Sequence, residues 1–445
     1  MAINTNFIRA STYKPNHLIL IKYAIAIAVG LVVGKKVVPG NVMSIVQFAG
    51  IAICFWYGIK ENYNKLFSVL PYVCYNEAYM RGFVKSFPYL ALQYFFIFLF
   101  GYLFFKNIST KKAHTNAYLL MLVYGILEFI QSFFPDDPEL LRPIIVNSIA
   151  LIVIIVWASF NQLTPVIIHK TLTNIKVASI YLASIVYVAH LDGGITYNTQ
   201  SNFGASNGLA PVQLSAYLGL GCILLLFSFM NAEERKFRLY NIALFAYSVT
   251  VMVLTFSRGG LYFLGIVLLL FFYFNRVQLG KYAKLLFLIP IGLGIFSYVR
   301  DQTGGAIVKR YERQDASNRG VLVLQGFRLF FEEPLLGVGT GNYATQVFLR
   351  KYYDRVSTAH NEFVRAAAEH GIWGLLCYWG FFIWIFRVII LRNGPNKEYS
   401  LYFLTLFCLI IIHNGLKISI QPLLMIMAIA NPNTLLYKKK AYAKS

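Results

Sequence analysis

The chain has 445 residues, of which 58% are hydrophobic and only 13% are charged, and its mean hydropathy is +0.59. Soluble domains carry roughly 25% charged residues, so this composition excludes a protein that presents water-facing surface on all sides. The formal net charge of +22 does not indicate nucleic acid, because Lys and Arg cluster in short loops between apolar runs, as they do in membrane proteins.

Apolar runs that could cross a bilayer recur along the whole chain. Backbone groups inside a bilayer must bond within their own segment, so such runs form helices. Their residues do not alternate between apolar and polar, as β-barrel strands would. In chain order the runs are 18–34, 42–59, 66–80, 88–105, 117–134, 143–160, 177–191, 211–230, 239–256, 259–274, 282–299, 372–391, 399–415 and 416–436. We expect an all-α polytopic membrane protein with about 12–14 transmembrane helices, forming one domain over residues 1–445. The run 66–80 is the least secure, because it contains Pro71, Asn76 and Glu77.

The distribution of Lys and Arg between the runs predicts the topology. Cytoplasmic loops are enriched in these residues. The basic loops are 106–116, 231–238, 275–281, 392–398 and 438–444, whereas 135–142 and 192–210 carry little positive charge. Alternation then puts the long segment 300–371 outside. Lys35 and Lys36 fall in a loop predicted to be outside and are an exception to the rule.

Segment 300–371 is the one sizeable polar insertion. It holds ten Lys or Arg and eight Asp or Glu, and it is too long for a simple connection. Residues 318–331 have helical periodicity, and one side of that helix carries Val321, Leu324, Phe327 and Phe331. A glycine-rich turn follows at 337–342, and a second helix is predicted from Ala359 to about His370, ending at Gly371. We expect a helical cap inserted between two transmembrane helices.

Arg258 lies in the short junction Ser257-Arg258-Gly259-Gly260 between two apolar runs. An arginine at the membrane boundary is costly to bury, so it is a functional hypothesis by default. The alternative is that it reaches out to lipid head groups. The two glycines would also allow close approach of a ligand to the backbone.

Arginines crowd one half of the insertion, at Arg310, Arg313, Arg319 and Arg328. Guanidinium groups bind phosphate in a bidentate manner, so a group of them favours a phosphate or diphosphate ligand. The alternative for each arginine alone is an ion pair with nearby Glu312, Asp315, Glu332 or Glu333.

His360 and Asn361 open the second predicted helix. Histidine is the usual general base near neutral pH, although a structural hydrogen-bonding role is equally open for a single residue. Glu369 is nine residues further on, about 180° round the helix, so it would not touch His360. The spacing is not that of a zinc protease.

Other patterns point to structure rather than chemistry. The glycine run 337–342 lacks the strand and the Lys-Ser/Thr of a nucleotide loop, so a tight turn is the better interpretation. The turn 135–139 (PDDPE) could hold a divalent metal, but a proline-bounded turn with helix caps is favoured. The five scattered cysteines favour neither a metal site nor disulfides, and we predict no metal and no cofactor.

Taken together, the motifs resemble the O-antigen ligase and O-antigen polymerase superfamily of bacterial membrane glycosyltransferases. The resemblance covers roughly residues 240–390. It rests on four motifs in order, which are 255–260 (TFSRGG), 317–320 (SNRG), 333–342 (EPLLGVGTGN) and 359–374, where AHNEF is followed by EHGIWG.

The resemblance implies a GT-C-like fold with a large periplasmic loop, in the bacterial inner membrane. It implies an undecaprenyl-diphosphate-linked glycan as donor and two essential arginines and a histidine, which carry over as Arg258, Arg319 and His360. Arg310 and Arg313 are alternatives for the second arginine, and Arg328 is a further candidate for the diphosphate. Ser257, Asn361 and Glu369 would have supporting roles. The arginines would stabilise the leaving diphosphate, and His360 would activate the acceptor hydroxyl in an inverting transfer without a metal.

Three functions stay open. A polymerase would add the glycan to a second lipid-linked glycan, and a partner protein could regulate chain length. A ligase would use lipid A core as acceptor. A flippase for the same lipid would need polar residues along a central cavity. Glu128, Gln131, Asn147, His413 and Asn414 could form such a path, but they are not a regular set of buried acids. Polymerase is our leading interpretation.

Overall fold

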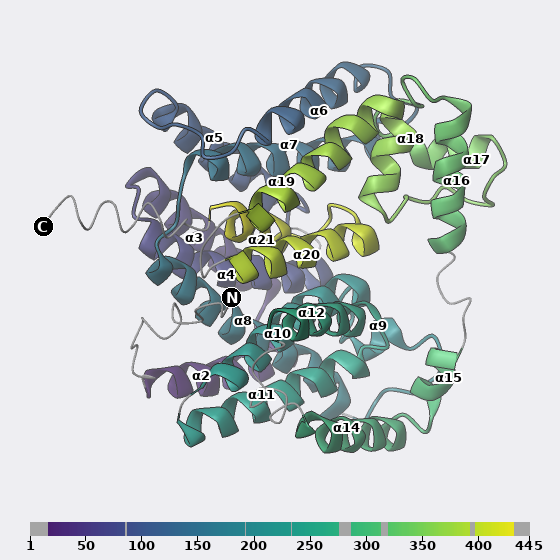
Figure 1. The fold of residues 1–445 in the computed structure, drawn as a ribbon. Helices are drawn as coiled ribbons and strands as arrows, with labels where there is room; N and C mark the ends of the chain where they lie inside the picture. Colours follow the sequence, from purple (N-terminus) through teal and green to yellow (C-terminus); the bar gives the residue numbers. More distant parts are fainter. Residues whose placement is uncertain are drawn as a thin grey trace, which may run out of the picture.

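The structure is a computed structural model that describes residues 17–84, 87–191, 193–232, 234–275, 286–312, 319–391 and 397–430. These residues form helices and connecting turns, and they contain no strand (Figure 1). The first half comprises α2 (Leu18–Gly34), α3 (Gly40–Ile59), α4 (Tyr63–Phe83), α5 (Ala91–Asn107), α6 (Tyr118–Gln131), α7 (Pro138–Phe160), α8 (Pro165–Leu191), α9 (Asn202–Ala205) and α10 (Pro211–Asn231). The second half comprises α11 (Arg235–Leu254), α12 (Gly259–Asn275), α14 (Leu288–Gln302), α15 (Ala306–Glu312), α16 (Arg319–Glu332), α17 (Tyr343–Leu349), α18 (Glu362–Gly374), a π-helical turn η1 (Leu375–Trp379), α19 (Gly380–Leu391), α20 (Lys397–Asn414) and α21 (Ile420–Ile429).

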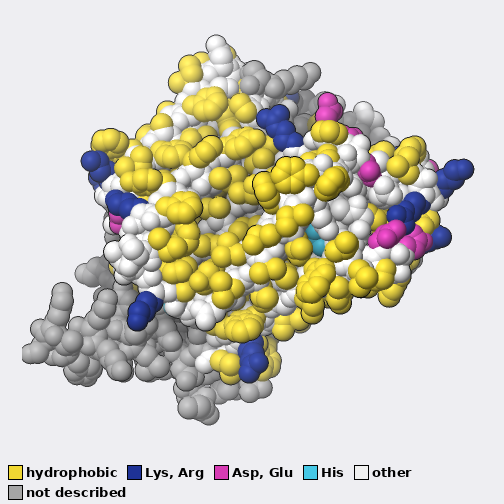
Figure 2. Space-filling view, turned by 90° about the horizontal axis from the view of Figure 1, so that it is seen from above, with side chains coloured by type: hydrophobic (Ala, Val, Ile, Leu, Met, Phe, Trp, Pro, Cys, Tyr) yellow, Lys and Arg dark blue, Asp and Glu magenta, His cyan; other side chains and the backbone are white. Residues whose placement is uncertain are grey.

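Within the described ranges, six helical stretches are long and apolar enough to cross a membrane, and five shorter apolar helices accompany them. The long ones are α3, α7, α8, α10, α11 and the continuous stretch from α18 to α19. A broad field of hydrophobic side chains covers the middle of the face in Figure 2, and acidic and basic side chains gather at its right-hand end. The prediction of an all-α polytopic membrane protein is confirmed.

The least secure predicted run is a helix, α4. Its polar residues are buried with partners: the side chain of Asn76 donates to Oε1 of Gln47 at 2.8 Å, and Glu77 pairs with Arg81 at 2.7 Å. The predicted run 416–436 is shorter than expected in its described part, because α21 extends only from Ile420 to Ile429. Residues 431–436 lie outside the described residues.

Helices α8 and α10 form the centre of the helical bundle. Helix α8 packs against α2, α4, α10 and α11, and α10 also packs against α11, α12 and α20. Helix α10 is buried round most of its circumference, whereas α3 exposes most of its surface. The ends of α11, α12 and α20 are therefore held by the best-packed part of the protein.

Helices α15, α16 and α17 and the start of α18 lie at one end of the bundle, which we call the cap end (Figure 1). A helix is present where the periodicity of 318–331 predicted it, but its apolar side faces outward: Leu324 and Phe331 are 68% and 74% exposed. The buried side is built around Gly326, where a Cβ atom would stand 2.2 Å from Val364. Close approach of α18 requires the small residue, so this side turns inward.

The glycine-rich turn packs tightly on α18. Gly337 has φ +67°, and a Cβ atom there would stand 2.3 Å from the carbonyl carbon of Glu369. The backbone N–H groups of Val338 and Gly339 donate to the carbonyls of Ala368 and Glu369, at 3.0 and 2.9 Å. These donors are occupied within the protein, so the interpretation as a tight turn is confirmed. Gly371 punctuates α18 as predicted, with φ +59° and ψ −140°.

Candidate active site

Four helices begin close together at the cap end, and each has a basic residue at or just before its first turn. The helices are α12, α16, α18 and α21, and the basic residues are Arg258, Arg319, His360 and Lys417. The N-terminus of a helix carries partial positive charge and unpaired N–H groups. The arrangement therefore concentrates positive potential in one place, as an anionic substrate requires.

Arg258 is half-buried between two parts of the chain. Its guanidinium lies 5.4 Å from the centre of the Tyr311 ring, and its Nη2 donates to the carbonyl of Arg310. Ser257 is fixed beside it by a 2.9 Å hydrogen bond to Ser215 of α10. These contacts bring α15 of the cap against the junction between α11 and α12.

The glycines after Arg258 serve packing, and the prediction that they leave room for a ligand is wrong. A Cβ atom on Gly259 would stand 2.6 Å from Nε2 of His413, and one on Gly260 would stand 2.5 Å from the carbonyl of Ser215. The space beside both residues is occupied by α20 and α10. The close fit instead brings the start of α12 to His413.

Arg319 contacts the same histidine from the cap. Its Nη1 atom lies 2.6 Å from Nδ1 and 2.7 Å from Nε2 of His413. A guanidinium can only donate, so the imidazole of His413 must accept and is neutral in this pair. Burial lowers the pKa of Arg319 from its ordinary value. Arg319 and Gly259, the residue after Arg258, thus both lie against His413, which the sequence did not connect with either.

His360 is half-buried in the segment between α17 and α18. Its backbone has φ +53°, a conformation that a non-glycine residue rarely adopts and that often marks a functional site. Burial, together with the charges of Lys417 and Arg319, lowers the pKa of His360 to about 4. At neutral pH the imidazole is therefore neutral and able to accept a proton.

Asn361 caps the N-terminus of α18 directly after His360. Its side-chain oxygen accepts from the N–H groups of Phe363 and Val364, at 3.0 and 3.3 Å, and so caps α18. This cap accounts for Asn361 as a structural residue. Because α18 begins directly after this cap, His360 stays on the irregular segment before the helix, near the charges of Lys417 and Arg319.

Lys417 is a site residue that the sequence analysis missed. Its Nζ donates to Oγ1 of Thr358 at 2.9 Å, and burial lowers its pKa. Arg81 of α4 donates to the carbonyl of Lys417 at 2.5 Å and is itself paired with Glu77. The available signal was a lone lysine near the start of the predicted run 416–436, which is costly in a membrane without a function.

Glu369 belongs to a buried network behind the site and, as predicted, does not approach His360. Arg365 of α18 donates to Glu369 and Glu362 at 2.5 Å each and to Glu128 of α6 at 2.7 Å. One cation thus faces three carboxylates, all of them buried. The network ties the first turn of α18, next to His360, to α6.

The remaining candidates do not join the basic group in the described residues. Arg328 pairs with Glu332 at 3.2 Å and stacks on Tyr352, and it lies nine residues, or ~13 Å, along α16 from Arg319 on the opposite side. Arg313 lies outside the described residues, and the carbonyl of Arg310 is what contacts Arg258.

The acidic turn is structural, as the favoured interpretation held. Asp137 caps α7 by accepting from Glu139 and Leu140, and Asp136 accepts from Gln346 at 2.6 Å. Within the described ranges, no three His, Cys, Asp or Glu side chains stand close enough together to hold a metal ion.

Comparison with known proteins matches one part of the chain to a protein family. Residues 242–379 match the protein family described as O-antigen ligase. The match includes Arg258, Arg319 and His360, and it ends at Trp379, the last residue of η1. No curated protein matches the sequence. Families of this description are glycosyltransferase-like enzymes of ligase or polymerase type. This match over residues 242–379 supports the resemblance of that part of the chain to the O-antigen ligases and O-antigen polymerases.

Proposed function

We propose that the protein transfers a glycan from an undecaprenyl-diphosphate carrier to a sugar hydroxyl at the cap end, which faces the periplasm from the bacterial inner membrane. The observation that carries the proposal is the neutral His360 within reach of the charges of Arg319 and Lys417. Such a transfer requires cations that stabilise the anionic leaving group and a base that accepts the proton of the acceptor hydroxyl.

In this mechanism the diphosphate lies among Arg258, Arg319 and Lys417. The acceptor oxygen attacks the anomeric carbon from the face opposite the diphosphate, and the bond from that carbon to the phosphate oxygen breaks. The electron pair of that bond leaves with the diphosphate, whose growing charge the three cations stabilise. The proton of the acceptor hydroxyl passes to His360. The product has the inverted configuration.

His413 has a positioning role in this proposal. It holds Arg319 through the 2.6 Å contact and borders the start of α12 through Gly259. The supporting roles of Ser257 and Asn361 follow from their contacts, because Ser257 anchors the Arg258 junction to α10 and Asn361 caps α18. Glu369 supports α18 through Arg365.

The preferred acceptor is a second lipid-linked glycan, which makes the protein a polysaccharide polymerase. A ligase that uses lipid A core is the second candidate, and the description of the matching family favours it. Purified protein in nanodiscs, supplied only with undecaprenyl-diphosphate repeat units, should produce a ladder of longer glycans. Transfer that begins only when lipid A core is added would identify a ligase. The absence of transfer to either acceptor would overturn the proposal.

A further inference from the structure

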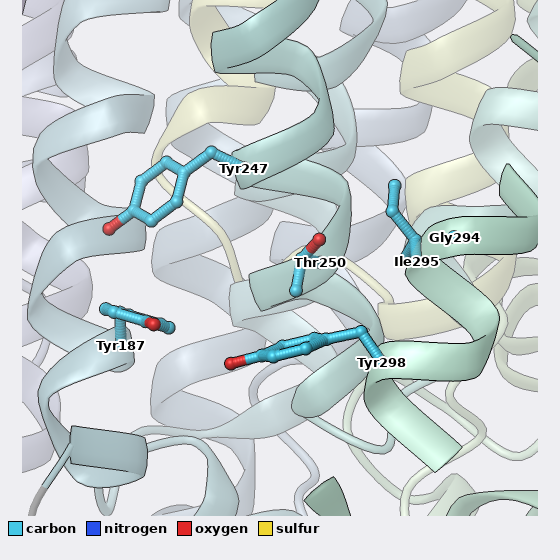
Figure 3. A pocket seen from close by; sticks show the side chains of 6 residues that line it. All are labelled: Tyr187, Tyr247, Thr250, Gly294, Ile295 and Tyr298. Atoms are coloured by element: carbon cyan, nitrogen blue, oxygen red, sulfur yellow. The ribbon is translucent and has the colours of Figure 1, made fainter. Parts of the chain in front are cut away.

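A pocket of about 370 Å³ lies between α8, α11 and α14, away from the basic residues described above (Figure 3). Its lining is Tyr187, Tyr247, Thr250, Gly294, Ile295 and Tyr298. Its volume is within the range of small-molecule sites, ~300–1,000 Å³. Within the described residues, helix α14 packs mainly on α11 and α15 and lies at the edge of the bundle in Figure 1, so the pocket lies at the periphery of the bundle.

The pocket lies a short way below the cap end. Tyr187, Thr250 and Tyr298 each come four residues before the last residue of their helices, which are Leu191, Leu254 and Gln302. At 1.5 Å per residue this depth is ~6 Å below the helix ends. The junction to Arg258 begins directly after Leu254. The pocket is therefore at the depth of the first part of a lipid tail whose head lies near Arg258.

The polar groups of the lining are already used within the protein. The hydroxyl of Tyr247 donates to Ser184 at 3.1 Å, and that of Thr250 donates to the carbonyl of Ala246 at 2.8 Å. The hydroxyls of Tyr187 and Tyr298 interact with each other, and Figure 3 shows that of Tyr298 directed toward Tyr187. What remains for a ligand is ring and aliphatic surface. A sugar would need open hydrogen-bonding groups, so the chemistry favours a hydrocarbon.

A buried apolar cluster lies between the pocket and the anion site. Ile295 of the lining and Val253 of α11 pack against a cluster of buried residues, which are Ala205, Leu254, Phe256, Val299, Ala306 and Ile307. Tyr311 packs against the same cluster, and its ring lies 5.4 Å from the guanidinium of Arg258. The pocket and the anion site therefore border the same packed apolar cluster from two sides.

We propose that this pocket binds the first isoprene units of the donor's polyprenyl tail, next to the diphosphate. This inference rests on the proposed function, because the head group at Arg258 selects which lipid enters. Branched, unsaturated units suit a short pocket walled by three tyrosine rings, since methyl groups and double bonds pack against ring faces. The pocket would thereby hold the anomeric carbon at a fixed depth relative to His360.

Two glycines of α14 provide a matched pair of variants. A Cβ atom on Gly294 or on Gly292 would meet nothing within 4 Å, so larger side chains fit at both positions without a clash. Gly294 lines the pocket, and Gly292 does not. Gly294→Leu should fill the pocket, while Gly292→Leu adds the same bulk elsewhere on the helix.

The test is photolabelling in phosphatidylcholine nanodiscs with geranylgeranyl diphosphate that carries a diazirine in its tail. We expect adducts on Ile295 or Tyr298, competition by unlabelled geranylgeranyl diphosphate, loss of these adducts in Gly294→Leu and their retention in Gly292→Leu. Gly294→Leu should also raise the KM for the donor about tenfold at unchanged kcat, the effect of losing roughly two buried CH₂ groups.

Labelling elsewhere, or unchanged labelling in Gly294→Leu, would overturn the inference. Labelling of the pocket by a tail-diazirine phosphatidylcholine that the diphosphate cannot displace would overturn it too, and would identify a site for bulk lipid. The outcomes separate this inference from the proposed function: a protein without transferase activity can still show the predicted adducts, and an active protein can lack them.

Discussion

Arg319 and His413 are 94 residues apart in the chain, yet Nη1 of the arginine lies 2.6 Å from Nδ1 of the histidine. The contact joins α16 of the cap to the end of α20 in the helical bundle. Because a charged guanidinium is held by a neutral acceptor, its positive charge is not cancelled by a carboxylate. This contact leaves the full charge of Arg319 for a substrate anion.

Replacing His413 therefore tests the positioning of Arg319. His413→Gln keeps an acceptor, and His413→Leu removes it. We expect His413→Leu to raise the KM for the donor about tenfold, the value of one lost charge-assisted hydrogen bond, and His413→Gln to recover most of it. The KM values of both variants are measured from the dependence of the transfer rate on donor concentration. Equal KM values for His413→Leu and the unchanged protein would show that Arg319 does not depend on this contact.

Arg328 and Arg319 make a direct comparison on one helix. Arg319→Ala should reduce kcat by about 100-fold or more, as loss of a group that stabilises developing charge does. Arg328→Ala should leave the rate within twofold, because Arg328 pairs with Glu332 and Tyr352 on the far side of α16. Transfer rates in nanodiscs test this comparison. A large loss of rate in Arg328→Ala would contradict the placement of Arg328 outside the basic group.

The pH dependence follows from His360. Its pKa of about 4 means that the acid limb of kcat/KM, which reports on the free enzyme, should fall near pH 4 rather than near 6.5. Lys417→Met removes a nearby positive charge, so it should raise the pKa and move that limb to higher pH. Lys309→Met, at an exposed position of α15, is the control and should leave it in place. A limb that stays fixed in Lys417→Met would contradict the proximity of the two groups.

The same shift has a consequence for stability. The folded pKa of His360 is below its unfolded value of about 6.5, so protonation favours the unfolded chain. The contribution of His360 to the free energy of unfolding is complete above pH 6.5, and it decreases as the pH falls toward 4. His360→Gln should accordingly flatten the pH dependence of thermal stability across this interval, measured in detergent.

The network around Arg365 should dominate the stability of α18. Removing one partner of a buried ion pair typically costs ~3–5 kcal/mol, because the remaining charges lose their compensation. Arg365→Met leaves Glu128, Glu362 and Glu369 buried without their cation, so we expect a large fall in Tm and in yield. Arg355→Met, an exposed arginine of the cap, is the control. Similar Tm values for the two variants would contradict a structural role for the network.

Gly371 should tolerate no side chain. It has φ +59°, and a Cβ atom there would stand 2.5 Å from the carbonyl of Pro334. Gly371→Ala should cost ~1–3 kcal/mol of backbone strain and displace the glycine-rich turn from α18. Gly320→Ala, where a Cβ atom meets nothing within 4 Å, should have no such cost. Comparable thermal unfolding of the two variants would refute this.

Hydropathy alone was enough to locate most helices. The run predicted at 18–34 coincides with α2, and the run at 42–59 lies within α3, because lipid forces any long apolar segment to be helical. The cap helix at α16 and the break at Gly371 were also predictable, since periodicity and glycine act locally. Which side of α16 faces outward could not be predicted, because it depends on which neighbour approaches Gly326.

The site was predictable only in part, for the same reason. Arg258, Arg319 and His360 stood out by motif, and the structure brings Arg319 and His360 within electrostatic range. Lys417 and His413 belong to a distant part of the sequence and reach the site only through the packing of α20 against α12 and α18. A contact between residues so far apart leaves no local pattern, so a single sequence cannot reveal it.

The most direct test of the central claim is the transfer rate of His360→Ala in nanodiscs that contain undecaprenyl-diphosphate repeat units and, in parallel, lipid A core. Loss of a general base typically costs 10²–10⁴-fold in rate, so we expect a fall of at least about 100-fold with unchanged Tm and unchanged binding of the donor. A rate equal to that of the unchanged protein would contradict the assignment of His360 as the base among these cations.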